Sequence, residues 1–95
     1  MYESVLELLK YDLSFRNTSR DDYLLNLIES SAAQIKSYGV DLDLDTAADA
    51  MFLSDWCAFA YRNRLEGKEL PRNLRLRLND RIVDERSKYV PEDPI

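Results

Sequence analysis

The stretch that decides the fold runs from Thr46 to Arg64 and reads TAADAMFLSDWCAFAYRNR. From Ala47 to Tyr61 the only polar residues are Asp49, Ser54 and Asp55. On a helix, the large apolar side chains of this stretch point in nearly every direction around the axis. A helix that is apolar all round is enclosed by other structure. We therefore predict a helix that lies centrally in a bundle or against another subunit.

Three further helices are predicted around this one, joined by short polar loops, over residues 3–10, 21–38 and 71–88. The helix over 21–38 has the clearest apolar face, formed by Leu24, Leu27, Ile28, Ser31, Ile35 and Tyr38. We expect Thr18 or Ser19 to cap its start. Gly39 is expected to end it in the left-handed conformation that glycine adopts readily.

The last helix contains an alternation, Leu-Arg-Leu-Arg-Leu over 74–78, that would also suit a strand. We favour a helix that starts at Pro71, because the apolar pattern continues through Ile82 and Val83 without a turn signal. As a helix it carries two apolar stripes. Leu74, Leu78 and Ile82 lie on one side, whereas Leu76 and Val83 lie nearly opposite. We expect the first stripe to pack inward and the second to face outward.

These elements predict an all-α fold: a small four-helix domain over residues 1–88, with an extended C-terminal tail over 89–95 that contains two prolines. The chain has 95 residues, of which 45% are hydrophobic and 33% charged, a globular composition. A domain of this size buries only somewhat over about 60% of its unfolded-chain surface. Association with further copies would add to that burial.

The residue types argue against catalysis and bound cofactors. Cys57 is the only cysteine and the chain has no histidine, so thiol–imidazole catalysis, a disulfide framework and cysteine- or histidine-based zinc sites are excluded. Cys57 itself lies among large apolar residues and is interpreted as a buried small hydrophobe. We expect no enzyme activity, no cofactor and no metal.

The spacing of Asp41, Asp43 and Asp45 echoes the start of an EF-hand calcium loop. That reading fails, because Thr46 stands where the loop needs glycine and Phe52 where it needs a bidentate glutamate. We interpret the segment as a linker in which Asp43 or Asp45 caps the central helix. The acidic N-terminus and the lack of an apolar run of about 20 residues predict neither a signal peptide nor a membrane span.

Charge divides unevenly along the chain. Residues 1–60 contain eleven acids and four bases, whereas residues 61–95 contain seven acids and nine bases, within a net charge of −5. The bases crowd into one strip, made of Arg62, Arg64, Lys68, Arg72, Arg75, Arg77 and Arg81. A chain with an acidic half and a basic strip can dock on a copy of itself. A solvated basic face would explain the strip as well.

As an interface, the strip would pair with acids of a neighbour around an apolar centre of Leu76 and Val83. The candidate interface residues are Arg72, Arg75, Leu76, Arg77, Arg81 and Val83, with Tyr89, Val90 and Ile95 as contacts from the tail. Asp49 and Asp55 are six residues apart and do not form a carboxylate pair on one helical face. We expect them in solvated or inter-subunit positions.

Three stretches together resemble the head–tail connector, or adaptor, proteins of tailed phages and prophages. They read LELLKYDL over 6–13, DDYLLNLIESSAAQIKSYG over 21–39, and AFAYRNR over 58–64 followed by LPR over 70–72 and a last helix. The resemblance spans about residues 5–82. The alternating Leu-Arg strip and the Trp56-Cys57 pair are not features of that family.

The resemblance implies a helical protein that forms a ring, dodecameric in the virion, beneath the portal protein. It further implies a tail-side completion protein as partner, DNA only as passing cargo, and a place at the head–tail junction after synthesis in the bacterial cytoplasm. A second hypothesis from another class remains open. A small helix-turn-helix-like DNA-binding regulator could use the strip over 72–81 to enter a groove of the duplex.

Overall fold

The computed structural model describes residues 2–87 and contains four helices: α1 (Glu3–Leu13), α2 (Asp21–Lys36), α3 (Ala47–Arg62) and α4 (Arg72–Ser87). No strand occurs within residues 2–87. The predicted all-α fold is therefore confirmed, as is the choice of helix over strand for 74–78. The predicted tail and its contacts Tyr89, Val90 and Ile95 lie outside the described residues.

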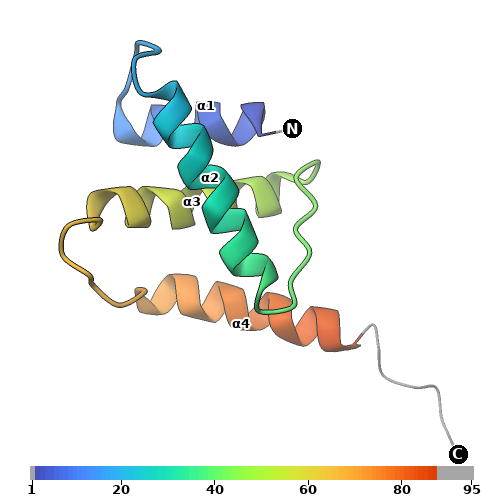
Figure 1. Ribbon diagram of the computed structural model, residues 1–95. Coiled ribbons are helices and arrows are strands. Elements are labelled where there is room, and N and C mark those ends of the chain that lie inside the picture. Colours follow the sequence, from blue (N-terminus) through green and yellow to red (C-terminus); the bar gives the residue numbers. More distant parts are fainter. Residues whose placement is uncertain (1, 88–95) are drawn as a thin grey trace, which may run out of the picture.

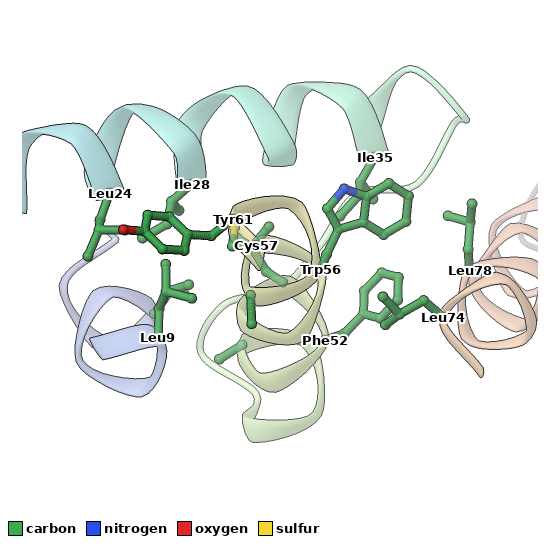
Figure 2. Packing of buried hydrophobic residues seen from close by; sticks show 14 of the residues in the cluster. Leu9, Leu24, Ile28, Ile35, Phe52, Trp56, Cys57, Tyr61, Leu74 and Leu78 are labelled. Carbon is green, nitrogen blue, oxygen red and sulfur yellow. The ribbon is translucent and has the colours of Figure 1, made fainter. Parts of the chain in front are cut away.

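Three of the helices form a layer, and the fourth crosses it. Figure 1 shows α1, α3 and α4 side by side, with α3 in the middle and α2 running diagonally across them. Figure 2, seen from close by, shows the same order, with α2 above a row of α1, α3 and α4. Helix α3 packs against all three others, and α1 also packs against α2. Of the two placements predicted for this helix, the structure shows the central one within the bundle.

The core lies where α2 meets this layer. Eight residues of α3 are buried, and Val5, Leu9, Leu24, Ile28 and Ile35 meet them from α1 and α2. The rings of Phe52 and Trp56 pack edge to face, with centroids 5.8 Å apart. Leu74 and Leu78 complete the cluster from α4 (Figure 2). Cys57 is fully buried within it, as its apolar surroundings in the sequence predicted.

The ends of the helices differ from prediction in their details. Neither Thr18 nor Ser19 caps α2; the N–H and hydroxyl of Ser19 both donate to the side chain of Asn17, at 3.1 and 2.7 Å. At α3 the capping side chain is Thr46, which accepts from the Asp49 N–H, whereas Asp43 and Asp45 do not cap the helix. Short polar side chains compete for nearby N–H groups, so spacing alone does not determine which side chain caps the helix.

Two predicted boundaries are also shifted. Helix α1 continues three residues beyond the expected residue 10 and ends at Leu13, and the following Ser14 adopts a left-handed φ of 64°. Helix α2 ends two residues before Tyr38. Gly39 nevertheless has the expected positive φ, 86°, a backbone conformation that residues other than glycine rarely adopt.

Candidate subunit interface

Helix α4 has an inner and an outer side. Leu74 and Leu78, four residues apart, are buried against the core, and Ile82 is partly buried beside them. Leu76 and Val83, seven residues apart, share the opposite side and are 50% and 65% exposed. The two predicted stripes are therefore present, and the second one is uncovered within residues 2–87.

Two of the predicted interface arginines turn inward instead. Arg77 Nη1 lies 2.8 Å from Asp55 Oδ2, and Arg81 Nε lies 3.0 Å from Asp49 Oδ1. Both guanidinium groups also lie over the ring of Phe52, at 5.2 and 4.3 Å from its centroid. They tie α4 to α3 within one chain.

These pairs correct the expectation for the two acids. Asp49 and Asp55 are neither purely solvated nor left for another subunit, because each already has a basic partner on α4. Sequence spacing within α3 could not reveal this, since the pairing depends on how α4 lies beside it. Arg77 and Arg81 are correspondingly less available to a neighbouring subunit than the prediction assumed.

The remaining arginines of α4 point away from the core. Arg72, Arg75 and Arg86 are exposed, and none has an ion-pair partner among residues 2–87. Their spacing of three and fourteen residues places them along one flank of the Leu76 and Val83 stripe. We call the set Arg72, Arg75, Leu76, Val83 and Arg86 the α4 outer face.

A second uncovered apolar region was missed by the sequence reading. Leu8 and Tyr11 of α1 are 37% and 89% exposed. They line a groove of about 550 Å³ between α1 and the start of α3, which we call the α1 groove. Its other walls include Glu7, Leu44, Asp45 and Ala47.

The sequence held a signal for this groove that the prediction did not use. In the sequence, Val5, Leu6, Leu8 and Leu9 predict a single apolar side for the helix over residues 3–10. In the structure Val5 and Leu9 are buried, whereas Leu8 continues into a second row with Tyr11, three residues on. Leu8 and Tyr11 of this second row line the groove.

The α1 groove is acidic, in contrast to the α4 outer face. Glu7 and Asp45 are exposed on its walls, and neither carboxylate has an ion-pair partner in the described part of the chain. Lys10, on the same helix as Glu7, is paired with Asp21 at 2.8 Å. The charged residues on the walls of the α1 groove are thus both acidic. The α4 outer face carries three arginines, and Asp80 is also exposed on that side of α4, between Leu76 and Val83.

Neither a cluster of metal-ligating side chains nor an exposed thiol is present among residues 2–87. No group of three or more metal-ligating side chains converges within residues 2–87. The only thiol, that of Cys57, is buried, and this burial raises its pKa to about 11, which disfavours the nucleophilic thiolate. Both surfaces are suited to binding a protein by apolar contact and complementary charge.

Comparison with known protein families, with curated proteins and with solved structures finds no match. Among the described residues, no helix has both the length and the apolar character that crossing a bilayer demands. Function is therefore inferred from the residues of this chain, and the resemblance to head–tail connectors stays a prediction.

Proposed function

We propose that the protein is a non-enzymatic structural adaptor of a tailed phage or prophage. In this proposal copies of the chain form a ring beneath the portal protein, which joins head to tail and extends the DNA channel. The observation that carries the proposal is the α4 outer face. Leu76 and Val83 stand exposed there, on a helix whose other side buries Leu74 and Leu78 in the core. Because each is already partly covered, covering the rest would gain on the order of 1 kcal/mol for each.

The distribution of charge supports repeated association. The basic flank of α4 and the acidic walls of the α1 groove are on different elements, and α3 lies between α1 and α4 in the helical layer (Figure 1). Unlike surfaces on one subunit favour head-to-tail contacts, which close into rings when the rotation between subunits permits. The portal and a tail-side completion protein are the further partners that we propose. Acidic residues facing the channel would let DNA pass as cargo without sticking.

The alternative of a DNA-binding regulator is less well supported. Helix-turn-helix motifs join helices at about 90–120° through a turn of three or four residues. Here α3 and α4 run antiparallel, side by side, and residues 63–71 connect them (Figure 1). In addition, Arg77 and Arg81 of the proposed reading strip are held by Asp55 and Asp49.

Deleting the gene in its host tests the adaptor proposal. We expect DNA-filled heads and separate tails to accumulate, and the wild-type gene supplied in trans to restore joined particles. A Leu65→Asp variant provides a matched control, because Leu65 is 90% exposed but lies in the 63–71 loop, away from both surfaces. It should restore joining like the wild type. Normal virions in the deletion strain would refute the proposal.

A further inference from the structure

We propose that the α4 outer face of one copy docks into the α1 groove of the next copy. This inference deepens the proposed function and rests on it for the meaning of the ring, although the contact itself can be tested separately. The occupant of both surfaces is thus a second copy of this chain.

Both surfaces have exposed apolar residues that the contact would cover. Leu76 and Val83 are 50% and 65% exposed on α4, and the α1 groove offers Leu8, Tyr11 and an open volume of about 550 Å³. Tyrosine is frequent among the residues that dominate binding at interfaces. Tyr11, 89% exposed, is the largest side chain that the contact would cover.

Charge selects the α1 groove rather than a second α4. Two α4 outer faces brought together would place three arginines of each copy on one small interface, and only Asp80 of each copy would offset them. The excess of like charge disfavours that contact. The α1 groove instead offers the carboxylates of Glu7 and Asp45, which have no basic partner of their own among residues 2–87. The favoured contact is therefore heterologous.

The order of the helices in the layer makes the contact intermolecular. Helix α3 lies between α1 and α4 in the layer (Figures 1 and 2), so α4 does not lie over the α1 of its own copy. Docking α4 onto the α1 of a neighbour would extend the layer from copy to copy. Every added copy presents a fresh surface of each kind, and only closure into a ring uses them all.

Two variants with one damaged surface each test the contact. The first, Leu76→Asp with Val83→Asp, damages the α4 outer face and leaves the α1 groove intact. The second, Glu7→Arg with Tyr11→Asp, does the reverse. All four side chains are exposed. We expect each variant alone to keep its helical circular dichroism and melting temperature, and to stay at monomer mass in sedimentation velocity. Wild type and the Leu65→Asp control should form larger assemblies.

Mixing the two variants gives the decisive result. One intact α4 outer face then meets one intact α1 groove, so we expect a 1:1 complex of twice the monomer mass and nothing larger. The proposal is overturned if the mixture stays monomeric while wild type assembles, or if the Glu7→Arg, Tyr11→Asp variant assembles like wild type. A wild type that is monomeric at every concentration overturns it as well.

If an aspartate variant unfolds, a set of charge-reversal variants tests the same contact. Arg72→Glu with Arg75→Glu should abolish assembly, and adding Glu7→Arg and Asp45→Arg in the same chain should restore it. Failure of this restoration, with the fold intact, overturns the contact. The proposed function fails separately: if the mixed variants pair as expected but the deletion strain makes normal virions, the contact stands and the adaptor role falls.

Discussion

At the residue scale, Cys57 links the core to a measurable pH dependence. Its thiol is fully buried, and burial raises its pKa from 9.0 to about 11, because a thiolate would lose its hydration there. A raised pKa in the folded state stabilises the fold below the ordinary pKa. That stabilisation is lost as pH rises through the folded value.

We therefore expect the free energy of unfolding to fall by on the order of 2 kcal/mol between about pH 9 and pH 11 through this one group. Urea titrations at a series of pH values measure the change. The Cys57→Ala variant, which starts from a lower stability because of the cavity, should lack this part of the alkaline loss. Parallel pH profiles for the two proteins would refute the assignment.

At the scale of the elements, Asp49 joins three segments. Its side chain accepts from the Asp43 N–H at 2.8 Å in the linker and from Arg81 of α4, while its own N–H donates to the Thr46 cap. Asp55 has a single partner, Arg77, in a pair that is more exposed to water. The two residues are both aspartates of α3, but Asp49 contacts more segments than Asp55.

This difference predicts unequal effects of matched substitutions. Asp49→Ala should lower the free energy of unfolding by about 1–3 kcal/mol, because it leaves several polar groups without partners. Asp55→Ala, which removes one partly exposed ion pair, should cost at most about 1 kcal/mol. Chemical denaturation of both variants measures the two losses. Equal losses of unfolding free energy would show that the additional contacts of Asp49 do not stabilise the fold.

The elements also show how far the sequence determines the fold. Periodicity alone correctly predicted four helices, the central place of α3 and the inward turn of Leu74 and Leu78. It could not predict that Arg77 and Arg81 reach Asp55 and Asp49, because both arginines stand in the same basic strip as the exposed Arg75. Local spacing determines which side of a helix is apolar, whereas charge pairing depends on the neighbouring helix.

At the scale of the whole molecule, the candidate site was half predictable. The exposed stripe of Leu76 and Val83 follows from the sequence of one helix. The α1 groove does not, since it brings Leu8 and Tyr11 beside Ala47, residues far apart in the chain. That α1 and α4 form opposite edges of one layer is a property of helix order, which pattern alone does not specify.

The net charge of −5 predicts weak binding to duplex DNA. We expect no sub-micromolar binding at physiological salt when fluorescence anisotropy is measured with a labelled duplex at several salt concentrations. A duplex bound tightly, with affinity lost on changing Arg72 and Arg75 to alanine, would instead favour the regulator hypothesis. Both arginines are exposed, so this variant should remain folded.

The central claim is that copies of this chain assemble into a closed ring. Native mass spectrometry of the purified protein over a range of concentrations, with electron microscopy of the same samples, tests it most directly. The account predicts one dominant high-mass species of fixed stoichiometry that grows at the expense of monomer, and round particles with a central hole. A monomer at all concentrations, or a two-fold dimer that does not grow further, would contradict it.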